Sequence, residues 1–286
     1  CGFDRYSDST ATDWLPCREN AVCKQWCADT LTTMVDIVYP PIITSARIAF
    51  KLWGLKFDVV GAHHVPTEGG AVIASNHVSY LDFIFVGLGA DESKRLVRFM
   101  AKDSVFDNVV SGPLMKGMHH IPVDRSGGAN AYNEALAALR SGEVIGVFPE
   151  ATISRAFLIK DLKSGSARLA AQADVPLIPM IVFGGQRMVS KGTPRSLRRG
   201  TSILITVGEP MHPTATDDPD VVTAELRARL EGLLADTIDR YPDQPRDDSD
   251  RWWLPATHGG TAPTLAQAKA EDAAAAKARR DAREQA

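Results

Sequence analysis

The chain has 286 residues, of which 44% are hydrophobic and 23% charged, and this is the usual composition of a globular protein. Its net charge of −3 gives no overall signal for nucleic-acid binding. No GxGxxG, P-loop or GxSxG motif is present, so nothing favours dinucleotide binding, mononucleotide binding or serine hydrolysis.

All four cysteines lie within the first 27 residues, at Cys1, Cys17, Cys23 and Cys27. Their spacing lacks the paired C-x2-C form of a zinc site, which favours free thiols in a reducing cytosol. A lipidated mature terminus at Cys1 and a zinc-dependent function are weaker alternatives, and we expect no secretory signal peptide. We therefore expect no metal and no cofactor.

Residues 31–53 form the most apolar long segment, but charged residues interrupt it and Pro40-Pro41 would break a helix at its centre. A spanning helix needs about 20 mostly apolar residues in succession. Two short helices joined at the prolines fit better, as a hairpin in the membrane interface or, equally, packed on the protein's own core. In the membrane reading, the contacting residues are Tyr39, Trp53, Arg47 and Lys51.

Apolar strand-like runs alternate with helical segments between residues 69 and 210. The predicted strands are 71–74, 98–101, 121–123, 144–148, 177–182 and 202–207, and the predicted helices are 83–88, 112–118, 130–140 and 165–172. Such alternation predicts an α/β fold with an open, largely parallel sheet flanked by helices. Ligands of these sheets bind beyond the carboxyl ends of the strands.

Four predicted strand ends carry polar or turn-forming residues. They are Asn76-His77, Asp124-Arg125, Glu150-Ala151-Thr152 and Phe183-Gly184. Each alone has a structural explanation, such as an ion pair between Asp124 and Arg125. Four of them in order point to a ligand site at one edge of the sheet.

His77 and Asp82 stand five residues apart, which on one helix would direct them about 140° from each other. They can meet only where the chain bends, as at a strand-to-helix turn. Ser79 is placed to cap the following helix, with Asp82 in the partner position of a capping box. Asp82 therefore either caps only, or also orients the imidazole of His77 as a general base.

The ordered blocks resemble those of the glycerolipid acyltransferase family, whose type members are the lysophosphatidic-acid acyltransferases. The matching stretches are Asn76-His77 through Asp82, residues 121–125, residues 147–152, residues 175–179, and a Lys-x-Gly-x-Ala stretch beginning at Lys163. The resemblance covers roughly residues 55–210. It implies that His77 is the general base and that Asp82 orients it.

The resemblance also implies where the acceptor binds. Arg125 takes the position of a phosphate-binding arginine, and Glu150 and Thr152 match the third block. Ile153 stands where the family pattern has a second arginine, and Arg155 is the substitute we consider first. Asn76 is a further acceptor candidate, and Lys163, Arg168 and Arg187 are cationic candidates ranked lower.

Three regions are expected: residues 1–54 with the interfacial hairpin, an acyltransferase domain over 55–245, and a linker with an alanine-rich charged tail over 246–286. Residues 220–240 predict an amphipathic helix packed on the core. Trp252-Trp253 is an apolar island expected to dock on the domain rather than enter lipid. The tail is expected to be helical or disordered.

The expected function is transfer of an acyl group from acyl-CoA or acyl carrier protein to a glycerolipid hydroxyl, first of all lysophosphatidic acid. Glycerol 3-phosphate or another lysophospholipid are alternative acceptors, since Ile153 departs from the pattern. A non-catalytic lipid-binding protein of the same fold is the alternative from another class. We expect peripheral or monotopic association with the cytoplasmic face of a membrane, and no nucleic-acid partner.

Overall fold

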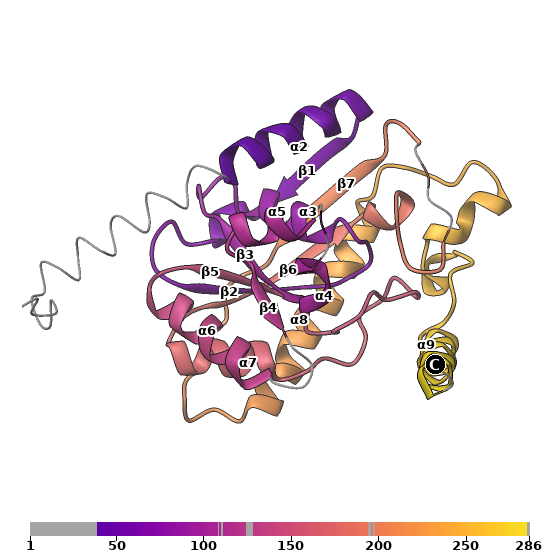
Figure 1. The fold of residues 1–286 in the computed structure, drawn as a ribbon. Coiled ribbons are helices and arrows are strands. Elements are labelled where there is room, and N and C mark those ends of the chain that lie inside the picture. The colour runs from indigo at the N-terminus through magenta and orange to yellow at the C-terminus, as the bar shows by residue number, and fades with distance from the viewer. Residues whose placement is uncertain are drawn as a thin grey trace, which may run out of the picture.

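The computed structural model describes residues 39–107, 109, 111–123, 128–193, 196 and 198–284 (Figure 1). The four N-terminal cysteines and the first half of the expected hairpin lie outside these residues. Its second half is helix α2 (Tyr39–Trp53), in which Pro40 and Pro41 occupy the first turn, where a missing backbone N–H costs nothing.

A seven-stranded sheet is the centre of the described structure, in the order β1-β7-β6-β2-β5-β3-β4. Its strands are β1 (Lys56–Val60), β2 (Ala71–Ser75), β3 (Val97–Lys102), β4 (Ile121–Val123), β5 (Val144–Val147), β6 (Leu177–Phe183) and β7 (Ser202–Val207). Among these strands, β6 and β7 form the one antiparallel pair. The predicted α/β fold with a mostly parallel open sheet is confirmed.

The two faces of the sheet bury two separate apolar clusters. On β2, Val72 and Ala74 face one cluster while Ala71 and Ile73 face the other, as the two-residue period of a strand requires. Helices α6 (Gly128–Arg140), α7 (Gly165–Ala173) and α8 (Pro219–Asp239) cover the first cluster, and α2 and α3 (Asp82–Gly89) cover the second. Because helices cover both faces, central strands such as β2 and β6 are buried throughout and almost entirely apolar.

Shorter helices α4 (Asp103–Phe106) and α5 (Ser111–Gly117) lie between β3 and β4. Strand β1 was not predicted, and every one of its residues is exposed. An ion pair joins Arg47 of α2 to Asp91. Within the described residues, no helix is both long and apolar enough to cross a bilayer.

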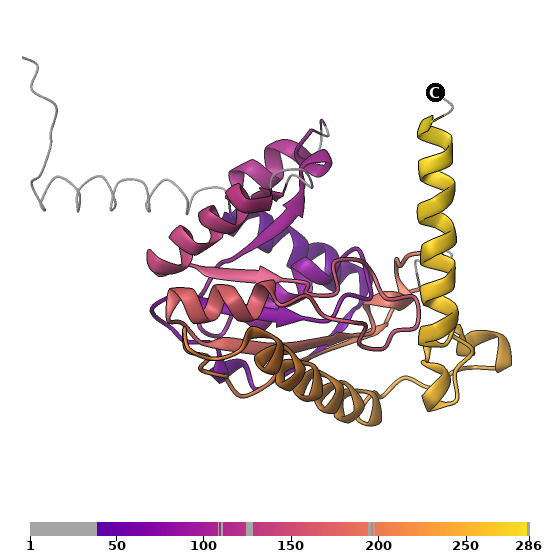
Figure 2. The same cartoon turned by 90° about the horizontal axis from the view of Figure 1, so that it is seen from below.

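Residues 241–284, which we call the C-terminal arm, follow α8. The arm contains two 3₁₀ helices, η3 (Asp248–Trp253) and η4 (Ala256–His258), and ends in α9 (Leu265–Glu284). Trp253 is buried against Phe183 and Tyr241, so the predicted docking of the tryptophan pair is confirmed. Helix α9 projects from the body of the molecule (Figure 2).

Candidate active site

His77 lies two residues beyond the end of β2, and the chain then bends into α3, which begins at Asp82. This bend brings Nδ1 of His77 to 2.9 Å from Oδ2 of Asp82. The same oxygen accepts the backbone N–H groups of Val78 and Ser79 at 2.6 and 2.7 Å. Asp82 is fully buried, so the turn fixes both its position and that of the imidazole it contacts.

The expected side-chain cap by Ser79 is present in part. Its hydroxyl accepts the backbone N–H of Leu81 at 3.2 Å, in the turn before α3, and also donates to the carbonyl of Val189 at 2.7 Å. The regular helix begins later than predicted, at Asp82, and the residue before it, Leu81, makes no side-chain cap of its own. The other half of the capping box is present, because Asp82 accepts the Ser79 N–H.

Burial raises the pKa of Asp82, while its hydrogen bond to His77 and its bonds to two backbone N–H groups lower it. Its second oxygen, Oδ1, is buried and has no hydrogen-bond partner among the described residues. A carboxylate at Nδ1 favours the tautomer with the proton on Nδ1, which leaves Nε2 unprotonated. The histidine is therefore oriented to accept a proton at Nε2.

The loop after β5 fixes the backbone of His77 from both sides. The N–H of His77 donates to Oε1 of Glu150 at 3.2 Å, and its carbonyl accepts the N–H of Ser154 at 2.7 Å. The imidazole also stacks on Phe148, with ring centroids 4.2 Å apart. The loop and the turn before α3 together fix the ring.

Glu150 is buried beside His77. Burial raises its pKa to about 8, although the hydrogen bond from His77 and the nearby charge of Lys160 act in the opposite direction. At neutral pH the carboxyl group is therefore mostly protonated. Its visible contact is with the His77 backbone, and a direct contact with the acceptor stays a prediction.

Of the other predicted acceptor-binding residues, one is held inside the domain, one is exposed, and one lies outside the described residues. The Asn76 amide donates to the carbonyl of Val182 and accepts its N–H, at 2.9 and 2.8 Å, and so ties the end of β2 to β6. Lys163 has an exposed side chain. Strand β4 ends at Val123, and Arg125 lies outside the described residues.

The third block presents its positive charge differently from the family pattern. Ile153 is buried, so it packs inside the domain instead of facing a ligand. Thr152 is exposed, and its hydroxyl accepts a hydrogen bond from Lys160 at 2.6 Å. Arg155 forms ion pairs with Glu271 and Asp272 of α9. Lys160 and Lys191 also contact Asp272, and no spacing in the sequence had marked either lysine.

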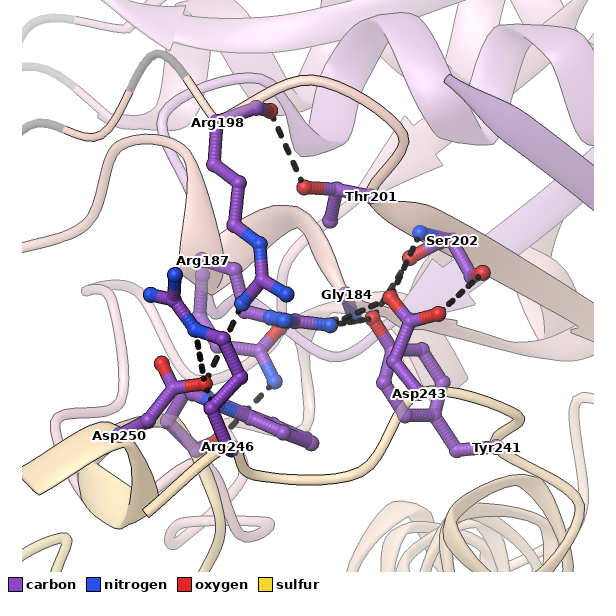
Figure 3. Close-up of polar contacts among 11 residues, drawn as sticks. Gly184, Arg187, Arg198, Thr201, Ser202, Tyr241, Asp243, Arg246 and Asp250 are labelled. Atoms are coloured by element: carbon purple, nitrogen blue, oxygen red, sulfur yellow. Dashed lines mark hydrogen bonds and ion pairs between the residues drawn. The ribbon is translucent and has the colours of Figure 1, made fainter. Parts of the chain in front are cut away.

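Arg187, ranked lower in the sequence, lies in a closed polar cluster where the C-terminal arm meets the domain (Figure 3). It is 4% exposed, and its Nη1 contacts Oδ2 of Asp243 at 2.5 Å and the Tyr241 hydroxyl at 3.1 Å. Its guanidinium carbon lies 4.2 Å from the ring centroid of Trp253. We call Arg187, Tyr241, Asp243 and Trp253 the Arg187 anchor.

Comparison with known proteins agrees with this geometry. A family model described as "Acyltransferase" matches residues 56–183, which contain His77, Asp82 and Glu150. The 1-acyl-sn-glycerol-3-phosphate acyltransferase of Bacillus subtilis is 30% identical over 158 residues, which are 54% of this chain and 73% of that protein. The enzyme of the same name from Limnanthes douglasii is 33% identical over 146 residues, half of each chain.

A solved structure shares the fold. The 1-acyl-sn-glycerophosphate acyltransferase of Thermotoga maritima superposes with a TM-score of 0.57 at 17% identity, covering 79% of this chain and 86% of that one. The family match, the Bacillus relative and the strand-end histidine agree. This chain belongs to the acyltransferase family.

Proposed function

We propose that this protein transfers an acyl group from an acyl thioester to the free hydroxyl of lysophosphatidic acid, forming phosphatidic acid. The observation that carries the proposal is the His77–Asp82 pair at the carboxyl end of a central parallel strand, where α/β sheets bind ligands. The names of the relatives support this acceptor. As the donor we propose acyl-CoA or acyl carrier protein.

The chemistry needs one base and no acyl-enzyme. Nε2 of His77 removes the proton from the acceptor hydroxyl as its oxygen attacks the thioester carbonyl. The tetrahedral intermediate then collapses, the C–S bond breaks, and the imidazolium returns the proton to the departing thiolate. Asp82 stabilises the imidazolium, and a base in this position contributes typically ~10²–10⁴-fold to the rate.

Acceptor recognition requires positive charge near this base. Arg125 is the predicted phosphate ligand from the second block and stays a proposal. Arg155 and Thr152 lie on the loop that fixes the His77 backbone, since the neighbouring Ser154 donates to the carbonyl of His77. This connection supports an acceptor phosphate on the loop side of the base.

The assay that tests the function is thiol release from palmitoyl-CoA with different acceptors. Lysophosphatidic acid, glycerol 3-phosphate, lysophosphatidylcholine and monoacylglycerol are compared, with an acceptor-free reaction as the control and mass spectrometry of the product. We expect the fastest release with lysophosphatidic acid. Faster release with the phosphate-free acceptor would overturn the assigned acceptor, and no release with any acceptor would favour a non-catalytic lipid-binding protein.

We also propose that α2 and β1 form a membrane-contacting surface. Ile48 and Leu52 of α2 are 56% and 70% exposed, and Phe57, Val59 and Val60 of β1 are exposed beside them. A hollow of 380 Å³ between the two elements is bordered by Arg47 and Lys51. Apolar side chains next to basic ones suit an anionic membrane interface. Tyr39 and Trp53, at the two ends of α2, stay predicted members of this surface.

Vesicle flotation tests the membrane proposal. The Leu52→Glu variant should bind vesicles of phosphatidylcholine and phosphatidylglycerol less than the wild type. The matched control is Val221→Glu, which places the same charge at an exposed apolar position on α8. Equal flotation of the two variants would contradict a specific role for α2.

A further inference from the structure

Three basic side chains converge on one carboxylate of α9. Asp272 Oδ1 lies 2.6 Å from Nζ of Lys191 and 3.3 Å from Nε of Arg155, and Oδ2 lies 3.2 Å from Nζ of Lys160. The three basic side chains and Asp272 are each about one-fifth exposed. We call Arg155, Lys160 and Lys191 the cation cluster.

The cation cluster adjoins the proposed active site. Arg155 follows Ser154, whose N–H binds the His77 carbonyl, and Lys160 contacts the Thr152 hydroxyl. The arm passes close by, because Ala262 packs against Val78 and Phe157 in a small buried cluster. Asp272 is therefore brought to the loop side of the base by the arm itself.

The backbone is shaped to bring these cations together. Gly192 follows Lys191 and has a φ of +79°. A Cβ atom built at this position would lie only 2.1 Å from Nη1 of Arg155. Glycine thus leaves the space that the guanidinium occupies next to Lys191, and any larger residue would displace it.

The cation cluster carries more positive charge than Asp272 can neutralise. Three cations face the single charge of Asp272, and the nearby Glu271 reaches only Arg155, at 3.4 Å, and is half exposed. A phosphate monoester carries nearly two negative charges at neutral pH and three acceptor oxygens. It would match three donors better than a carboxylate does, particularly with a guanidinium among them.

Helix α9 contacts the body through a narrow stripe. Ala268 is buried and Asp272 and Ala275 are half-buried, whereas the residues between them are exposed. These positions are four and three residues apart and so lie on one helix face. Ion pairs at this degree of exposure are individually weak. A ligand that binds the cations more strongly could therefore displace Asp272 without unfolding the domain.

We propose that the cation cluster, with the Thr152 hydroxyl, is a binding site for a phosphate monoester, and that Asp272 takes the place of this phosphate in the ligand-free protein. The assignment of the ligand as the acceptor headgroup rests on the proposed function. Coenzyme A also carries a phosphate monoester, at its 3′-ribose position, and is the other source of the same chemistry. Binding itself does not depend on catalysis.

Hydrogen exchange of α9 in the full chain tests the site without any turnover. Glycerol 3-phosphate should increase exchange over residues 265–284, and glycerol at the same concentration should not. Lysophosphatidic acid is compared with monoacylglycerol, and coenzyme A with dephospho-coenzyme A. The source of the phosphate is whichever of lysophosphatidic acid and coenzyme A increases exchange at the lower concentration while its phosphate-free control does not. If no phosphate monoester increases exchange in α9, the proposal is overturned.

The Asp272→Asn variant gives an independent test, with Asp281→Asn, an exposed position on the same helix, as its matched control. Exchange in α9 of Asp272→Asn should be high without ligand and insensitive to glycerol 3-phosphate. Its Kd for glycerol 3-phosphate should fall about three- to tenfold, because the competing carboxylate is gone. An unchanged or weaker affinity would show that these ion pairs are structural only.

The kinetic consequence separates this proposal from the proposed function. If the acceptor headgroup is the phosphate that binds the cation cluster, Asp272→Asn should lower the KM of lysophosphatidic acid and leave that of the acyl donor unchanged. If coenzyme A is the source, the KM of the acyl donor should fall instead. A protein that transfers no acyl group but still releases α9 on binding phosphate would refute the function and retain the site. An active enzyme whose α9 never responds to a phosphate monoester would refute the site and retain the function.

Discussion

The C-terminal arm meets the acyltransferase domain at two arginines that differ in their surroundings. Arg187 follows β6, is 4% exposed and lies between aromatic rings with Asp243 as its partner. Arg155 follows β5, is 21% exposed and shares Asp272 with two lysines. In the first cluster one carboxylate matches one cation, whereas in the second the cations are in excess.

Burial decides which contact can exchange its partner. A buried charge that loses its partner is left without water or counter-ion, so the Arg187 anchor is costly to open. At the cation cluster, water and ions can replace the carboxylate at little cost. The arm is therefore fixed at Tyr241 and Trp253 and exchangeable at α9, which is the arrangement that the proposed phosphate site needs.

The largest expected effect on stability belongs to Arg187→Ala. The change leaves Asp243 without its cation and removes the guanidinium from the face of Trp253. We expect the free energy of unfolding to fall by about 3–5 kcal/mol, measured by urea denaturation. Arg198→Ala, which removes a more exposed partner of Asp250 in the same arm, is the control and should cost less than about 1 kcal/mol. Equal losses would break the comparison.

Glu150→Gln tests whether the loop that contacts the His77 backbone excludes water as the Arg187 anchor does, because both Glu150 and Arg187 are buried. Glu150 ionises near pH 4.5 in the unfolded chain and at about 8 in the folded protein. Its contribution to stability is therefore fully present below pH 4.5 and is lost as the pH rises to 8, by about 1.4 kcal/mol per pH unit within this window.

The Gln variant lacks this titration. The difference in unfolding free energy between Glu150→Gln and the wild type should therefore grow in favour of the variant as the pH rises from about 5 to about 8, the window set by the two pKa values. Urea denaturation at several pH values measures the difference. Glu134→Gln, at an exposed position on α6, is the control. Parallel pH profiles for wild type and Glu150→Gln would mean that Glu150 is ionised in the folded protein.

Tyr241→Phe probes the Arg187 anchor with a smaller change. The Tyr241 hydroxyl donates to the carbonyl of Ser202 at 2.7 Å and accepts a hydrogen bond from Arg187. Removing it leaves a buried carbonyl with one partner fewer, so a loss of about 1–2 kcal/mol is expected in thermal or urea unfolding. No change would indicate that the aromatic ring, and not its hydroxyl, anchors the arm.

Arg155→Ala should have the smallest effect on stability, less than about 1 kcal/mol, because its ion pairs are partly solvated. Its effect should instead appear in the Kd for glycerol 3-phosphate, which should rise. A loss of stability as large as that of Arg187→Ala, with an unchanged Kd, would remove the distinction between the two arginines.

The sequence predicted most of the sheet because β2, β5, β6 and β7 are largely buried and read as continuous apolar runs. Strand β1 escaped prediction because its side chains are exposed, so no apolar run marks it. The bond from the Leu81 N–H to the Ser79 hydroxyl could be predicted from local pattern, whereas the bond from that hydroxyl to the distant carbonyl of Val189 could not.

The His77–Asp82 pair could be predicted because both residues lie at one turn. Asp272 could not, since it is 112 residues from Lys160 and 81 from Lys191 along the chain. No local period encodes such contacts. They depend on where the Arg187 anchor directs the arm.

Acceptor-dependent thiol release by His77→Ala tests the central claim most directly. With the fold confirmed by circular dichroism, the variant should release thiol from palmitoyl-CoA ~10²–10⁴-fold more slowly than the wild type in the presence of lysophosphatidic acid. Release at the wild-type rate would contradict the assignment of His77 as the general base, and with it the mechanism proposed for this protein.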